Sequence, residues 1–170
     1  MVLIIMGVVG AGKTTVGSLL ARKLGWTFAD ADDFHRPANI EKIKHGIPLD
    51  DNDRAPWLAA LRNAIVEWEQ PGENAVLACS ALKRKYRDEL RGDDVRFVYL
   101  EGSYELIRDR LHGRHGHFAT ESILNSQFQD LEVPADAITV NIDKAPEKIA
   151  DEIIAKLRTL QLAYPDATHK

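Results

Sequence analysis

One short segment near the N-terminus constrains this fold more than any other feature of the chain. Residues 7–14, GVVGAGKT, match the pattern G-x-x-x-x-G-K-[ST] at each of its fixed positions. The apolar, β-branched run Val2–Met6 precedes the segment, and residues 14–24 follow it with apolar side chains at helical spacing. This context predicts a phosphate-binding loop (P-loop) between a buried strand and a helix, and it disfavours an ordinary glycine-rich turn.

The residue types in this segment suit a nucleoside triphosphate. Glycines allow positive φ angles, which turn backbone N–H groups onto phosphate oxygens. Lys13 supplies a positive charge for the β- and γ-phosphates, and Thr14 supplies a hydroxyl for Mg²⁺. The predicted nucleotide-binding residues are Gly7, Val8, Val9, Gly10, Ala11, Gly12, Lys13, Thr14 and Thr15.

Apolar runs and amphipathic stretches alternate along the rest of the chain without an internal repeat. This alternation predicts an α/β fold of three layers, in which helices flank a five-stranded parallel sheet. The functional crevice of such a sheet lies at the carboxyl ends of its strands. We expect strands at 2–6, 27–30, 75–79, 95–100 and 138–142, and helices at 14–24, 83–91, 103–111 and 146–160, with a small helix between Pro37 and Gly46 and a longer one between Asp53 and Pro71.

Composition excludes several classes of protein. The 170 residues are 45% hydrophobic and 28% charged, which is typical of one globular domain. A formal net charge of −4 argues against a protein that binds nucleic acid or a membrane surface, because such proteins need a basic face. The single cysteine, Cys79, cannot form an internal disulfide, and the apolar residues 2–11 are too few to cross a bilayer. We therefore expect a cytoplasmic protein without a signal peptide or membrane anchor.

Carboxylates at the end of the second expected strand indicate how the nucleotide is used. Asp30 and Asp32 lie where one can order Mg²⁺ and the other can draw a proton from an alcohol, whereas Asp33 is not favoured. The alternative is a solvated turn that caps a helix. The guanine-reading order N-K-x-D is missing, since residues 141–144 read NIDK, and the chain is too short for a motor.

Two further segments give a specific resemblance. Residues 30–57, DADDFHRPANIEKIKHGIPLDDNDRAPW, and residues 79–87, CSALKRKYR, resemble the gluconate kinases of the shikimate-kinase-like P-loop group. Gly116-His117-Phe118, Gln127-Phe128 and Leu131-Glu132 also lie where that family places such residues, so the similarity spans about residues 2–160. The resemblance implies a single kinase domain over residues 1–170, acting as a homodimer. It also implies transfer of phosphate from ATP, with Mg²⁺, to the 6-hydroxyl of D-gluconate.

The resemblance also implies roles for the acceptor side. By similarity to the D-x-D of shikimate kinases, Asp32 contacts the transferred hydroxyl and Asp30 lies nearer the metal. A sugar acid needs fixed cations and short polar groups, and residues 34–70 are expected to form the acceptor-binding helical segment. The candidates are Asp32, His35, Arg54, Ser80, Lys83 and Arg87.

Three of these cations have open alternatives. Arg54 also suits the start of a helix or an exposed ion pair. Lys83 and Arg87 are four residues apart on one expected helix, so they either point at one anion or leave Arg87 to pair with Asp88 or Glu89 on the surface.

A lid is expected over about residues 112–120. In related kinases a lid follows the corresponding helix and closes over ATP, which excludes water from the reaction. By that analogy Arg114 binds the phosphates and belongs to the catalytic set with Lys13, Asp30 and Asp32, while Arg110 and Pro146 flank the adenine. The alternative is a basic, solvated helix end. The histidines in this segment lack the partners needed for a zinc site.

Two other functions stay open from the residues alone. One is another small-molecule kinase of the same fold, acting on shikimate, a nucleoside or a nucleotide. The other is a nucleotide-dependent binding module without phosphotransfer. The acid pair distinguishes the second alternative, because a binding module has no need of Asp30 and Asp32.

Overall fold

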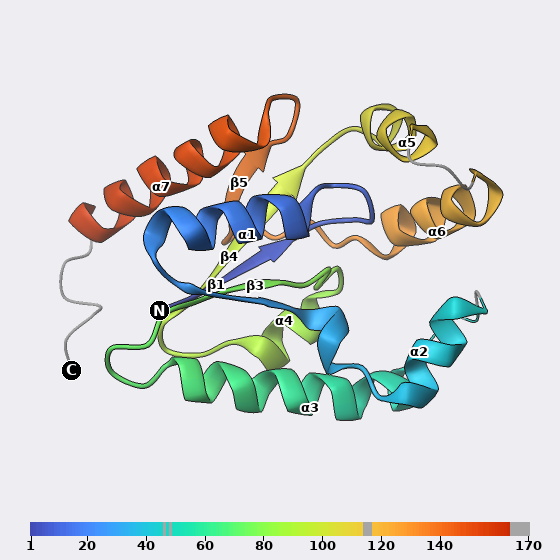
Figure 1. The fold of residues 1–170 in the computed structure, drawn as a ribbon, viewed down its shortest axis with the longest axis horizontal. Coiled ribbons are helices and arrows are strands. Elements are labelled where there is room, and N and C mark those ends of the chain that lie inside the picture. The colour runs from blue at the N-terminus through green and yellow to red at the C-terminus, as the bar shows by residue number, and fades with distance from the viewer. Residues whose placement is uncertain (46, 48, 114–116, 164–170) are drawn as a thin grey trace.

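The computed structural model describes residues 1–45, 47, 49–113 and 117–163 (Figure 1). The strands are β1 (Val2–Met6), β2 (Thr27–Asp30), β3 (Ala75–Ala78), β4 (Val95–Glu101) and β5 (Ile138–Asn141). The helices are α1 (Lys13–Leu24), the short 3₁₀ helix η1 (Ala31–Phe34), α2 (Pro37–Lys44), α3 (Asp51–Trp68), α4 (Arg84–Leu90), α5 (Tyr104–His112), α6 (His117–Asp130) and α7 (Pro146–Ala163).

The five strands form one parallel sheet in the order β2-β3-β1-β4-β5. After β1 the chain forms β2 and β3 on one side of β1, and it then crosses over to form β4 and β5 on the other side. The strand order therefore reverses at β1. Ligands of open parallel sheets bind at such a switch point, beyond the carboxyl ends of the strands. The P-loop follows β1 directly and therefore lies at this position. The predicted α/β architecture is confirmed.

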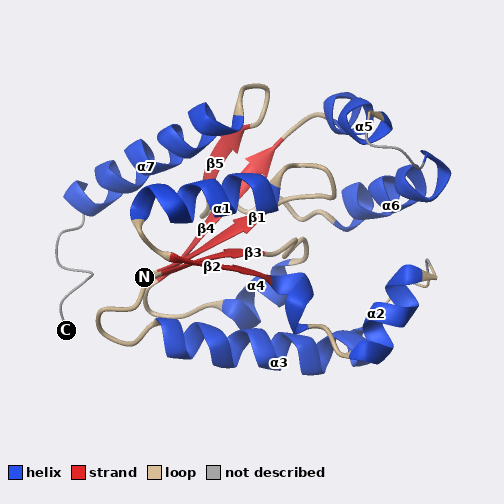
Figure 2. Ribbon diagram, viewed as in Figure 1, coloured by secondary structure: helices blue, strands red, loops and turns tan. Residues whose placement is uncertain are grey.

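Each face of the sheet has its own core, as the alternation of side chains along β1 shows. Leu3 and Ile5 belong to the cluster that includes residues of α1 and α7, whereas Val2, Ile4 and Met6 belong to the cluster that includes residues of α3 and α4. Figure 2 shows α1 and α7 on one side of the sheet and α3 and α4 on the other. All five residues of β1 are buried, which explains why its sequence is apolar without interruption.

Two elements were not expected from the sequence. η1 follows β2 at once, because the Asp30 side chain accepts a hydrogen bond from the Asp32 N–H and caps the turn. α6 occupies the second half of the expected lid and continues to Asp130. Its apolar pattern is weak, since Leu124 is fully buried while Ile123 beside it is exposed. Gly116, one of the residues that carry the family resemblance, lies outside the described residues.

The N-terminus of the long helix α3 is fixed by its cap residues, Asp50 and Asp53. The Asp50 side chain accepts from the Asp53 N–H at 2.8 Å, and the Asp53 side chain accepts from the Asp50 N–H at 3.1 Å. This reciprocal capping box fixes the first turn of α3 and hence the position of Arg54. Within the described part of the chain, no helix has both the length and the apolar character required to cross a membrane.

Candidate active site

The P-loop has the backbone geometry that its glycines permit. Gly7, Gly10 and Gly12 have φ angles of 148°, 80° and 95°, all in the region that favours glycine. α1 begins at Lys13, so its N-terminal N–H groups face the loop. The Lys13 Nζ donates to the Val8 carbonyl at 3.0 Å. Burial lowers the pKa of Lys13, which marks a cation held away from bulk water.

Residues from four separate parts of the chain line one cavity of about 270 Å³ beside this loop. They come from the P-loop and the first turn of α1, the end of β2, the end of β3, and α6. The sequence predicts most of them, and it places the acid pair at the same edge of the sheet as the P-loop. The lining residues are Val9, Gly10, Gly12, Lys13, Thr14, Thr15, Asp30, Asp32, Ala78, Cys79, Ser80 and Gln127.

Asp30 lies against the P-loop. The Thr14 hydroxyl donates to Asp30 Oδ2 at 2.8 Å, and Asp30 Oδ1 accepts from the Asp32 N–H at 3.1 Å. A hydroxyl and a carboxylate are the hard oxygen ligands that Mg²⁺ prefers, and this ion commonly takes only one or two protein ligands beside phosphates and water. The pair therefore fits Mg²⁺. No cluster of three or more metal-ligating residues occurs among the described residues.

Asp32 has a different environment, although it is only two residues away. Burial raises its pKa, and the nearby Asp30 charge raises it further. The backbone between the two aspartates is anchored, because the buried Trp57 Nε1 donates to the Ala31 carbonyl at 2.7 Å. Trp57 is therefore a packing residue that also holds the backbone of the acid pair.

His35 stacks on Trp57, with ring centroids 4.8 Å apart and planes 11° apart. Burial lowers its pKa, Asp32 opposes this effect, and the positive charge of Arg54 adds to it. His35 therefore interacts electrostatically with both Asp32 and Arg54. Its Nδ1 is buried and has no hydrogen-bond partner among the residues that the structure describes. Arg54 itself donates from Nη1 to the Tyr86 hydroxyl at 3.0 Å.

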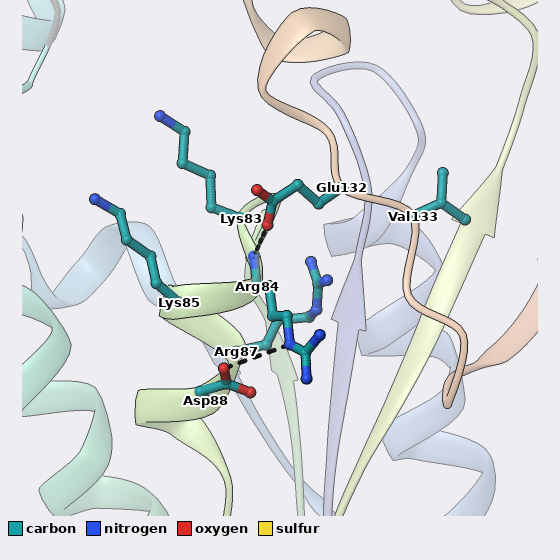
Figure 3. Close-up of a pocket in the computed structure, with 7 residues that line it drawn as sticks. All are labelled: Lys83, Arg84, Lys85, Arg87, Asp88, Glu132 and Val133. Atoms are coloured by element: carbon teal, nitrogen blue, oxygen red, sulfur yellow. Dashed lines mark hydrogen bonds and ion pairs between the residues drawn. The ribbon is translucent and has the colours of Figure 1, made fainter.

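Lys83 and Arg87 extend in different directions from α4, although both line the same cavity (Figure 3). They line a second cavity of about 580 Å³ with Arg84, Lys85, Asp88, Glu132 and Val133. Figure 3 shows the two lysines extending to one side of α4 and the two arginines to the other. Lys83 forms an ion pair with Asp130, at 3.2 Å.

Arg87 is not a surface residue either. It is only 4% exposed, and its Nη1 donates to the carbonyls of Ala81 and Leu82 at 3.0 and 2.8 Å. Ala81 has a φ of 43°, an unusual conformation for a residue with a side chain. Arg87 therefore supports the turn that presents Ser80 to the first cavity. These contacts exclude the alternative of a solvated surface ion pair, and a contact between Arg87 and the acceptor stays a prediction.

The residues assigned to the adenine and the lid are partly described. The Arg110 Nη2 donates to the Ile142 carbonyl at 2.6 Å, just after β5. Arg110 thus lies at the loop that leads to Pro146. Pro146 is the residue predicted to lie on the opposite face of the adenine ring from Arg110. Arg114 lies outside the described residues.

Gln127 is a site residue that had received no role from the sequence. Its Oε1 accepts from the Val9 N–H of the P-loop at 2.6 Å, although 118 positions separate the two residues. From the sequence, the pair Gln127-Phe128 is only a feature of the family resemblance. The sequence does not predict a helix at 117–130. Its apolar pattern therefore gives no reason to place Gln127 beside the P-loop.

Comparison with known proteins gives a consistent result. The model of the shikimate kinase family matches residues 9–158. A gluconokinase of Gluconobacter oxydans (strain 621H) is 49% identical over 157 residues, which cover 89% of this chain and 88% of that protein. The thermoresistant gluconokinase of Escherichia coli (strain K12) is 38% identical and covers 91% and 92%.

Solved structures agree in fold. The crystal structure of a gluconokinase from Sinorhizobium meliloti 1021 has a TM-score of 0.86 and 38% identity, with 96% of both chains covered. A shikimate kinase from Aquifex aeolicus shares the fold at 17% identity, with a TM-score of 0.61 over 95% of this chain and 99% of that one.

Proposed function

Because the chain belongs to the gluconokinases within the shikimate kinase family, we propose that it phosphorylates D-gluconate with ATP, giving 6-phospho-D-gluconate and ADP. One observation of the structure supports this most strongly. A single cavity holds Lys13 of the P-loop, the acid pair Asp30 and Asp32, and Ser80. A phosphate-binding cation thus lies close to a carboxylate that can receive a proton.

The chemical step follows from the two ends of this cavity. The backbone N–H groups of the P-loop and Lys13 bind the β- and γ-phosphates and stabilise the charge that develops during transfer. The 6-hydroxyl oxygen forms a bond to the γ-phosphorus as the bond from phosphorus to the ADP oxygen breaks. The hydroxyl proton passes to Asp32, whose raised pKa makes it a better base than an aspartate with an ordinary pKa.

Thr14 and Asp30 would hold Mg²⁺ through their oxygens. The ion would neutralise part of the phosphate charge. Asp30 then has no free role as a base, because its two oxygens face Thr14 and the Asp32 N–H. This difference between the two carboxylates supports the proposed roles, in which Asp30 holds the metal and Asp32 accepts the proton.

The acceptor is proposed to contact Asp32, His35, Arg54 and Ser80. Arg54 is the natural partner for the carboxylate, since a guanidinium binds a planar anion through two parallel hydrogen bonds. Lys83 remains a candidate at the margin of this region. Arg114 at the phosphates, and Arg110 with Pro146 at the adenine, stay predictions, as do a homodimer and a cytoplasmic location.

The alternatives have less support. A non-catalytic binding module gives no reason for an acid pair in which Asp30 bonds to Thr14 of the P-loop and Trp57 anchors the backbone at Ala31. Shikimate kinases share the fold at low identity, whereas gluconokinases are 38–49% identical over most of the chain. This difference in identity favours gluconate over shikimate as the acceptor.

The variant Asp32→Asn tests the proposed base, with Asp33→Asn as the matched neighbour. We expect Asp32→Asn to lower kcat by roughly 10²–10⁴-fold, because the hydroxyl proton has no acceptor. Binding of ATP, measured by calorimetry, is expected to stay within about threefold of wild type, and Asp33→Asn is expected to keep its activity. Full turnover in Asp32→Asn would contradict the role of Asp32.

A further inference from the structure

The side chain of Tyr86 joins α4 to the first turn of α3. Its hydroxyl accepts a hydrogen bond from Arg54 Nη1 at 3.0 Å and donates one to Asp51 Oδ1 at 2.9 Å. Lys85 holds the other oxygen of Asp51, with Nζ 2.6 Å from Oδ2. The hydroxyl thus has both a donor and an acceptor partner, and its orientation is fixed.

The same residue also supports Arg54 through its ring. The guanidinium carbon of Arg54 lies 5.5 Å from the centroid of the Tyr86 ring, within the range of a cation–π contact. Tyr86 is only 8% exposed, so this ring is a rigid surface. Two contacts from one side chain, at the hydroxyl and at the ring, therefore restrict the position of Arg54.

The rest of the Arg54 guanidinium is available for a ligand. Apart from the bond to Tyr86, none of its N–H groups has a hydrogen-bond partner among the described residues. The charge of Arg54 reaches His35, which stacks on Trp57 beside the acid pair. An oriented guanidinium with free donors at this position suits the carboxylate of a sugar acid.

We propose that Tyr86 is a positioning residue for acceptor binding, whose hydroxyl holds Arg54 in the orientation that binds the substrate carboxylate. This inference rests on the proposed function. An arginine loses much side-chain freedom when it binds a ligand, so a residue that fixes it beforehand strengthens binding without touching the substrate. The effect belongs to KM for the acceptor rather than to the phosphoryl-transfer step.

The test compares Tyr86→Phe, Arg54→Ala and the double variant by steady-state kinetics with ATP and D-gluconate. Tyr86→Phe keeps the ring and removes only the hydroxyl. We expect its KM for gluconate to rise about fivefold to twentyfold, with kcat and KM for ATP within twofold of wild type. Tyr104→Phe is the control, because the Tyr104 hydroxyl has no hydrogen-bond partner in the described part of the chain; its KM is expected to stay unchanged.

The double variant separates positioning from general damage to the fold. If the hydroxyl acts through Arg54, adding Tyr86→Phe to Arg54→Ala raises KM for gluconate no further. D-Glucitol, which lacks the carboxylate, gives a second measure: Tyr86→Phe should reduce the preference for gluconate over glucitol. A merely structural role would change both acceptors equally.

Each failure has its own signature. An unchanged KM in Tyr86→Phe, together with a raised KM in Arg54→Ala, overturns the role of Tyr86 and leaves that of Arg54. Additive effects in the double variant overturn it as well. An unchanged KM in Arg54→Ala removes the carboxylate site and with it the positioning role. A wild-type enzyme that does not phosphorylate gluconate overturns the proposed function itself.

Discussion

Asp30 and Asp32 show how contacts give one residue type two roles. Asp30 is tied to Thr14 and to the backbone N–H of Asp32. Asp32 has a raised pKa because burial and the charge of Asp30 both disfavour its ionised form. The family resemblance predicts two different roles, but the residue types alone do not, because the difference depends on which side chain the turn of η1 directs toward the P-loop.

The raised pKa of Asp32 has a consequence for stability. A carboxyl whose folded-state pKa is raised above its unfolded value stabilises the fold only when protonated, and this contribution is lost as the pH rises through that pKa. Ionised Asp32 is therefore a cost at neutral pH. We expect Asp32→Asn to raise the unfolding temperature at pH 7.5, with a difference from wild type that shrinks as the pH falls toward the Asp32 pKa.

Thermal unfolding of both proteins across this pH range measures the effect, with Asp33→Asn again as the neighbouring control. The result also bears on catalysis, because a group that destabilises the fold and is needed for turnover is typical of an active site. A lower unfolding temperature for Asp32→Asn at pH 7.5 would show that the carboxylate stabilises the fold, contrary to this account.

Gln127 carries a second prediction at the residue scale. Its Oε1 is the acceptor for the Val9 N–H, so Gln127→Leu leaves a P-loop amide without its partner. We expect roughly a tenfold loss in kcat/KM for ATP, equal to about 1.4 kcal/mol of transition-state stabilisation. Gln129→Leu, an exposed glutamine on the same helix, is the control. Equal kinetics in the two variants would exclude a functional role for this contact.

At the scale of elements, the P-loop packs closely against α5. A Cβ on Gly10 would lie 2.9 Å from Leu111 Cγ and 3.1 Å from Ile107 Cγ2. Gly25, at the end of α1, has a similar φ of 70° but nothing within 4 Å of the same position. Alanine at Gly25 therefore introduces backbone strain alone, whereas alanine at Gly10 introduces backbone strain and steric overlap with α5.

Alanine at each glycine tests this contact by urea unfolding. Gly25→Ala is expected to cost about 1–2 kcal/mol of unfolding free energy, the penalty for a left-handed residue with a Cβ. Gly10→Ala is expected to cost about 1–3 kcal/mol more, since the P-loop must move away from α5. Equal losses would mean that the loop and α5 adjust to one another freely.

The elements themselves were largely predictable. Buried parallel strands have continuous apolar sequences, so β1 and its neighbours were evident, and the capping residues located α3 to within a few positions. α6 was missed because its apolar positions do not form one clear stripe. The burial of Arg87 was not predicted, because spacing on a helix says which residues share a face but not whether that face is buried.

At the scale of the whole molecule, the site exists only because the sheet order reverses at β1. The ends of β1, β2 and β3 bring together the P-loop, the acid pair and Ser80, and α6 adds Gln127 from the far end of the chain. The motifs predicted the chemistry of each segment. Their convergence follows from strand order, and the contact between Gln127 and Val9 follows from long-range packing that no local pattern encodes.

The most direct test of the central claim is the choice of acceptor by the purified wild-type protein with Mg-ATP. Release of ADP is measured with D-gluconate, other hexonates, shikimate, nucleosides and no acceptor, and NMR locates the phosphate in the product. We predict strong turnover with D-gluconate and a phosphate on its 6-oxygen. Turnover with shikimate or a nucleoside but not with gluconate, or tight ATP binding without turnover of any acceptor, would contradict it.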